Sequence, residues 1–235
     1  MKKSSNSFLR SLRLSNGLAT AIAILFHAIG LTGMLWGNAK YFASLSSLNL
    51  LLVFILILLT QQQKNKSFFV FMATAILIGF GVEVIGVHTG WLFGKYHYTS
   101  QLGYAVFNVP LIIGANWFIV TYCSGMSIKA FQNKLSLKFP DASIESGKKI
   151  KFVSVVLDGA LLAVLFDWLM EPVAVKLGYW LWEGDIPFYN YFCWFVISSL
   201  LLWMFEKSSF EKRNKFAVHL LLIQSMFFLL LRTFL

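Results

Sequence analysis

The stretch FFVFMATAILIGFGVEVIGVHTGWLFGKYHYTSQLGYAVFNVP, residues 68–110, joins a long apolar run to a short polar loop. A helix needs roughly 20 mostly apolar residues to cross a bilayer, and residues 68–87 supply such a run with one charged side chain, Glu83. The loop after it is rich in histidine, glycine, tyrosine and tryptophan. Charged groups at membrane depth are costly and are usually kept where they line a site. The stretch therefore predicts a membrane protein whose working site lies near Glu83.

The rest of the chain repeats the apolar pattern. The composition is 58% hydrophobic and only 13% charged, and the mean hydropathy is +0.70. The candidate spans are residues 14–36, 44–61, 68–87, 104–122, 152–170, 190–205 and 216–234. Only helices and closed barrels satisfy their backbone groups inside a bilayer, and no run alternates as barrel strands do. We expect an all-α, polytopic bundle of about seven transmembrane helices.

The net charge of +10 follows the same topology. If the N-terminus is cytoplasmic, sixteen of the 20 Lys and Arg residues fall on inner segments, and only Lys40, Lys95, Lys176 and Arg232 fall on outer ones. This asymmetry predicts an N-in, C-out arrangement. The basic residues are therefore explained by the orientation of the protein in its partner, the lipid bilayer. We do not expect the protein to bind nucleic acid. The expected location is the cell (inner) membrane.

The chain divides into two parts of unequal length. Residues 1–13 are basic and serine-rich with interleaved apolar side chains, which is typical of a segment lying on anionic lipid. Residues 14–235 show no internal repeat and no second domain, so we expect them to form one transmembrane helical domain.

Acidic side chains gather at the predicted outer ends of the spans. Glu83 lies about one turn inside the end of its run, and Asp167 and Glu171 are four residues apart, so on a helix they share a face. We expect Pro172 to end or bend that helix. An apolar setting disfavours an ionised carboxyl group, which can then hold a proton near neutral pH and act as a general acid. Aromatic residues crowd the same side, as an interfacial belt or as the wall of a pocket that stabilises a cation.

Several classes of cofactor protein fit poorly. The last span has no lysine in its apolar interior for a retinal Schiff base, and His27 and His219 lie at unequal depths for a shared haem. His88 and His97 lack further ligands at a metal-binding spacing. We therefore expect neither a cofactor nor a metal.

Two separate blocks of the sequence combine acidic, glycine, proline and aromatic residues at defined spacings. The first is Glu83-x-x-Gly86-Val87-x-Thr89-Gly90-x-x-Phe93-Gly94-x-Tyr96-x-Tyr98, followed by Leu102-Gly103, Val109-Pro110 and Trp117. The second is Leu157-Asp158, Asp167-x-x-x-Glu171-Pro172-Val173-Ala174, Gly178-Tyr179-Trp180-x-Trp182, Pro187 and Asn190-x-x-x-Trp194. In order and spacing, these blocks resemble the membrane carotenoid-biosynthesis hydratase family (CruF-like carotenoid 1,2-hydratases), and the resemblance covers most of residues 68–205.

The resemblance implies a cofactor-independent hydro-lyase that adds water across the terminal 1,2 double bond of an acyclic carotenoid end group. Proton transfer to the alkene would give a tertiary carbocation, which water then captures. On this basis Glu83 is the expected acid or its partner, and Asp167 with Glu171 would position the water. The expected substrate-binding residues are His88, Trp91, Phe93, Tyr96, Tyr98, Trp117, Trp180 and Asn190. The expected partners are the acyclic carotenoid, water, the bilayer and other carotenoid-pathway enzymes.

Two alternatives share these residues. Another isoprenoid membrane enzyme, such as a carotenoid cyclase, would start from the same carbocation and close a ring. A proton-coupled transporter or channel would use the carboxyl groups as a relay, although the inner halves of the spans hold few acids.

Overall fold

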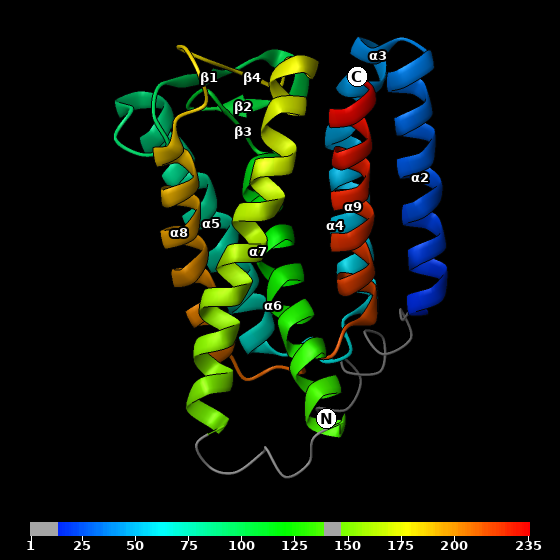
Figure 1. Ribbon diagram of the computed structural model, residues 1–235, viewed down its shortest axis with the longest axis vertical. Coiled ribbons are helices and arrows are strands. Elements are labelled where there is room, and N and C mark those ends of the chain that lie inside the picture. The colour runs from blue at the N-terminus through cyan, green and yellow to red at the C-terminus, as the bar shows by residue number, and fades with distance from the viewer. Residues whose placement is uncertain (1–13, 139–146) are drawn as a thin grey trace, which may run out of the picture.

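The apolar runs form long helices in the computed structural model, which describes residues 14–138 and 147–235 (Figure 1). The helices are α2 (Asn16–Trp36), α3 (Ala39–Ser44), α4 (Ser46–Thr60), α5 (Lys66–Thr89), α6 (Ile112–Lys138), α7 (Gly147–Leu177), α8 (Phe188–Lys207) and α9 (Lys215–Phe234). A 3₁₀ turn (Ser100–Leu102) and four short strands complete the described elements: β1 (Tyr96–Tyr98), β2 (Ala105–Val106), β3 (Val109–Pro110) and β4 (Trp180–Trp182). The predicted interfacial segment 1–13 lies outside the described residues.

Five helices of the described chain are long and apolar enough to cross a membrane: α2, α5, α7, α8 and α9. Helix α4 is apolar but shorter, with 15 residues. The prediction of an all-α membrane bundle is therefore confirmed, and the protein is a multi-pass membrane protein. The seven-span, N-in, C-out topology remains a prediction.

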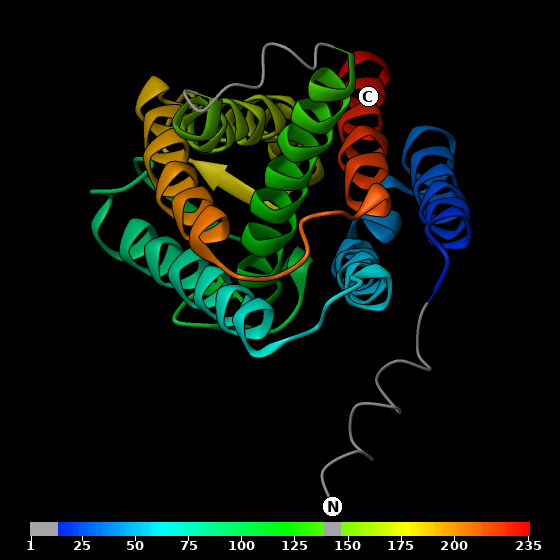
Figure 2. The same cartoon turned by 90° about the horizontal axis from the view of Figure 1, so that it is seen from below.

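The helices form two groups (Figures 1 and 2). Helices α5, α6, α7 and α8 form a ring, while α2, α4 and α9 lie together on one side of it. Helices α6 and α7 also pack against α9, so they form the boundary between the groups. The cavities described below follow this arrangement: one is lined by residues of the ring and its connecting loops, and the other by residues of both groups.

Two predicted helix ends are wrong. The run predicted from Tyr104 begins instead as the β2–β3 hairpin, whose turn residues Phe107 and Asn108 have φ of 51° and 61°, and the helix starts only at Ile112. Paired positive φ values are typical of tight hairpin turns, which asparagine tolerates well. Of the two outcomes predicted at Pro172, an end or a bend, the end is wrong: helix α7 continues to Leu177, because the flanking apolar residues remain buried and outweigh the one backbone hydrogen bond that proline lacks.

The loops that follow α5 and α7 pair with each other at one end of the bundle. Strands β1 and β4 are antiparallel, with Tyr96 opposite Trp182 and Tyr98 opposite Trp180. Successive side chains of a strand point to opposite faces, so these four aromatic rings share one face. The central residue of each strand is exposed, which shows that the aromatic face is directed at the helices. The β1–β4 ribbon thus places an aromatic cap, formed by Tyr96, Tyr98, Trp180 and Trp182, over the ring of helices.

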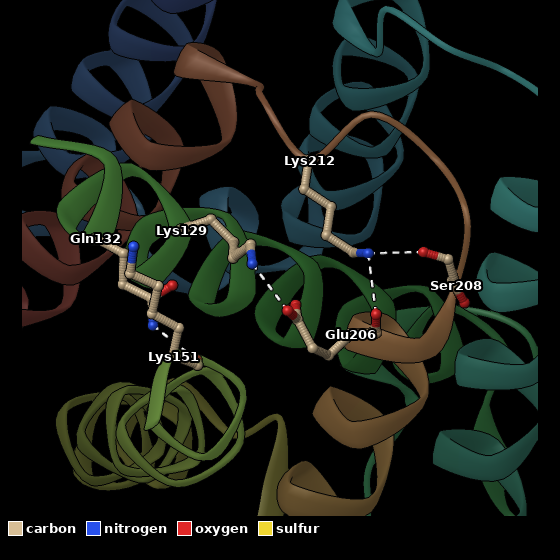
Figure 3. A network of polar contacts seen from close by, with 6 residues as sticks. All are labelled: Lys129, Gln132, Lys151, Glu206, Ser208 and Lys212. Atoms are coloured by element: carbon tan, nitrogen blue, oxygen red, sulfur yellow. Dashed lines mark hydrogen bonds and ion pairs between the residues drawn. The ribbon is translucent and has the colours of Figure 1, made fainter. Parts of the chain in front are cut away.

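The opposite end of the bundle is held by charged groups (Figure 3). Lys129 Nζ of α6 lies 2.8 Å from Glu206 Oε1 of α8, and the two side chains are only 22% and 13% exposed. Lys212 Nζ donates to the backbone oxygens of Glu206 and Ser208. These contacts fasten the α8–α9 connection to α6.

We expect Glu206→Leu to lower the free energy of unfolding by about 1–3 kcal/mol, because it leaves the half-buried ammonium of Lys129 without its partner. Glu211→Leu is the matched control. Its pair with Arg213 is largely exposed, and such surface pairs contribute about 0–1 kcal/mol. Denaturation of the detergent-solubilised protein measures both, and equal losses would contradict the prediction.

Candidate functional site

Glu83 accepts three hydrogen bonds inside the ring of helices. Tyr96 and Tyr98 of β1 donate their hydroxyls to Glu83 Oε2 at 2.5 and 2.7 Å, and Trp117 Nε1 of α6 donates to Oε1 at 2.9 Å. Gly79 makes this approach possible, because a Cβ there would lie 2.3 Å from that of Trp117. Burial, reinforced by the charge of Glu83, raises the pKa of both tyrosines well above the usual range. The two hydroxyls therefore remain protonated donors.

Glu171 is held by the second strand of the ribbon. Trp180 Nε1 and Trp182 Nε1 both donate to Glu171 Oε2, at 3.0 and 2.9 Å. These tryptophans face the tyrosines of β1, so the register of one two-stranded sheet supplies donors to two acids that lie on different helices. The two aromatic-rich loops, which follow α5 and α7, thus contribute donors to the same site.

Asp167 lies one turn before Glu171 and is fully buried. Asn190 Nδ2 of α8 donates to Asp167 Oδ2 at 2.8 Å. The other oxygen, Oδ1, is buried and has no hydrogen-bond partner among the described residues. A buried polar atom without a partner is costly, so its presence commonly has a functional explanation.

The three carboxyl groups surround a small cavity of about 20 Å³. Its wall consists of Glu83, Phe93, Tyr96, Tyr98, Ile113, Asn116, Trp117, Asp167, Met170, Glu171, Trp180, Trp182, Asn190 and Trp194. One water molecule needs roughly 10–15 Å³ of such space together with polar partners. The cavity can therefore hold a single water among three carboxyl groups. The stacked rings of Trp117 and Trp194, with centroids 4.0 Å apart, close one side.

A second and larger cavity, of about 360 Å³, lies between the two helix groups and is mostly apolar. Four residues line both cavities: Ile113, Asn116, Met170 and Trp180. Asn116 is the most polar of them and is only 7% exposed. The carboxyl cluster therefore borders a mostly apolar cavity whose volume is large enough for part of an organic molecule.

Most residues predicted for the site meet at the small cavity. They are Glu83, Phe93, Tyr96, Tyr98, Trp117, Asp167, Glu171, Trp180 and Asn190. His88 and Trp91 are not among them. His88 is exposed and its Nδ1 lies 2.9 Å from the backbone oxygen of Val84, while Trp91 is 76% exposed.

Asn116, Trp182 and Trp194 also line this cavity, although they are not among the site residues predicted from the sequence. Asn116 could have been predicted from the sequence, because a polar side chain inside an apolar span commonly marks a functional site. For the two tryptophans, an interfacial belt explains their position in the sequence equally well. Within residues 14–138 and 147–235, no three His, Cys, Asp or Glu side chains are grouped as metal ligands.

The fold and this site define a class: a multi-pass membrane protein with buried carboxyl groups beneath an aromatic cap. Residues 18–235 match the model of the family described as carotenoid biosynthesis protein. The chain therefore belongs to this family, which confirms the family prediction made from the two sequence blocks.

A similar curated protein is the bisanhydrobacterioruberin hydratase of Haloarcula japonica. It is 25% identical over 135 residues, which cover 55% of this chain and 42% of the relative. The chain thus spans less than half of that relative's length. No solved structure matches the chain significantly.

Proposed function

We propose that this protein is a carotenoid hydratase that adds water across the terminal 1,2 double bond of an acyclic carotenoid end group. The observation that carries the proposal is the space for one water among Glu83, Asp167 and Glu171, directly beside an apolar cavity. Membership in the carotenoid biosynthesis family and the hydratase relative support the same reaction. The proposed location is the cell (inner) membrane, where the substrate dissolves.

The first step is transfer of a proton to the less substituted alkene carbon. We assign this step to Asp167 instead of Glu83. Three donors satisfy Glu83, as suits a carboxylate, whereas Asp167 Oδ1 has neither a donor nor solvent access among the described residues. A protonated Asp167 avoids the cost of that unpartnered charge and has a proton to give. Glu83 is then a positioning residue that fixes the aromatic wall.

The second step is capture of the tertiary carbocation by water. The electrons of the broken π bond form the new C–H bond, which leaves the positive charge on the neighbouring tertiary carbon. Trp117, Trp180 and Trp194 line the cavity, and we propose that their π systems stabilise this charge. A water held beside Asn116 and Asn190 forms the C–O bond, and Glu171 accepts the proton that the water loses.

The reaction is balanced by these groups alone. One water and one alkene give one tertiary alcohol, and the proton taken by Glu171 returns to Asp167, which lies one turn away on the same helix. No electron is gained or lost overall, so the proposed chemistry requires no redox cofactor. The proposed partners are the acyclic carotenoid and water, with other carotenoid-pathway enzymes as sources and acceptors of the polyene.

Expression of the protein in a lycopene-producing host tests this function. We expect a product heavier than lycopene by one water, detected by mass spectrometry after chromatography, and absent from the empty-vector host. A cyclised product of unchanged mass would overturn the proposal in favour of a cyclase. An unaltered carotenoid pool, together with proton flux in liposomes, would favour a transporter.

A further inference from the structure

The larger cavity lies between the two helix groups and not inside either one. Its walls come from α2, α4 and α9 on one side and from α6 and α7 on the other. Most of the lining is aliphatic or phenyl, including Phe166, Met170, Phe227 and Phe228. A volume of about 360 Å³ falls in the range of small-molecule sites, roughly 300–1,000 Å³.

This cavity reaches the lipid-facing surface of the bundle. Phe26 and Ile29 of α2 and Leu48 of α4 line the cavity, yet their side chains are 47%, 50% and 62% exposed. Residues with both properties form the rim of an opening. Because α2 is long and apolar enough to span a membrane, an opening between α2 and α4 faces the acyl chains of the bilayer.

The opposite end of the cavity reaches the carboxyl cluster. Ile113, Asn116, Met170 and Trp180 belong to both cavities, so an occupant of the large one meets the small one at these side chains. The path from the lipid to the acids is mostly apolar, with His27, Asn49 and Gln224 among its few polar lining residues before Asn116.

We propose that this cavity is a lateral binding site for the chain of an acyclic isoprenoid, which enters from the bilayer between α2 and α4. The proposal rests on the proposed function, whose substrate is a membrane-dissolved polyene with a reactive tip. The tip lies at Asn116 and Trp180, the following part of the chain fills the cavity, and the remainder extends through the opening into lipid. The geometry therefore assigns end-on insertion, with a single end group reacting in each binding event.

Gly30 of α2 provides a way to obstruct the cavity. A Cβ at Gly30 would lie 3.7 Å from Phe227, an ordinary contact, so Gly30→Ala fits, whereas Gly30→Leu places three further carbons in the cavity. Gly81→Leu is the matched control, because a Cβ there meets no atom within 4 Å and Gly81 lines neither cavity. Both changes replace a helical glycine by leucine, so their effects on helix formation are similar.

The experiment measures lycopene retained per molecule of protein purified from a lycopene-producing host, by visible absorbance. All variants also carry Asp167→Asn, so that binding is recorded without turnover. We expect Gly30→Leu to lower retention about tenfold or more, equivalent to about 1.4 kcal/mol of binding free energy. Gly81→Leu should retain lycopene as the parent does, because Gly81 lines neither cavity.

Equal retention by Gly30→Leu and Gly81→Leu would overturn the proposal, as would purified protein that carries only phospholipid. The same variants with Asp167 intact separate this proposal from the function. Normal hydration by Gly30→Leu would refute the site and leave the function standing. Loss of retention in Gly30→Leu, with no hydrated product from the unaltered protein, would refute the function and leave the site standing.

Discussion

Asp167→Asn is expected to reduce water addition by about 10²–10⁴-fold, the usual contribution of a general acid. The change is nearly isosteric, and the new amide keeps one oxygen to which Asn190 can donate, so the fold should persist. What is lost is the transferable proton at the position of Oδ1. The hydrated product formed per molecule of protein, measured over time in membranes, gives the effect directly.

Asp158→Asn is the control for this prediction. Asp158 lies on the same helix, is exposed, and accepts a hydrogen bond from Ser154. We expect it to retain at least half of the hydration rate. Comparable rates for Asp167→Asn and the unaltered protein would exclude Asp167 as the proton donor.

Glu83→Leu is expected to destabilise the protein by about 3–6 kcal/mol, because it removes the acceptor of three buried or half-buried donors at once. Each orphaned donor is expected to cost about 1–2 kcal/mol, in the lower part of the usual range of about 1–3 kcal/mol. Unfolding of the solubilised protein by a denaturing detergent measures the change.

Glu83→Gln separates hydrogen bonding from shape. Its carbonyl oxygen can still accept from Tyr96 and Tyr98, but its amide nitrogen would face the N–H of Trp117. We expect a smaller loss, about 1–2 kcal/mol for the one bond that cannot form. A loss for Glu83→Leu no greater than that for Glu83→Gln would show that the three hydrogen bonds contribute little.

The membrane class and the meeting of the acids could be predicted from the sequence for a physical reason. Apolar runs of membrane length leave few alternatives to a helix bundle, and Glu83, Asp167 and Glu171 occupy similar depths near one end of their helices. Groups at similar depth that face the interior of one ring of helices are brought near one another by the packing of that ring.

The partners of each acid could not be predicted in this way. They depend on the pairing of β1 with β4, two strands of three residues that are separated by more than eighty positions in the chain. His88 and Trp91, which the family resemblance predicts as substrate-binding residues, do not line the small cavity. Helix α5 ends at Thr89 and its C-cap Gly90 has a φ of 67°, so the chain direction changes before the exposed Trp91. His88 precedes this turn and lies on a different face of α5 from Glu83. Local conformation decides such cases.

The ribbon and the acids depend on each other. A two-stranded ribbon of this length has little stability of its own, so its four rings keep their place largely through their bonds to Glu83 and Glu171. The β1–β4 ribbon is thus held in place by the same carboxyl groups that it covers. We expect loss of either carboxyl group to displace both strands together and to admit bulk water into a cavity sized for one molecule.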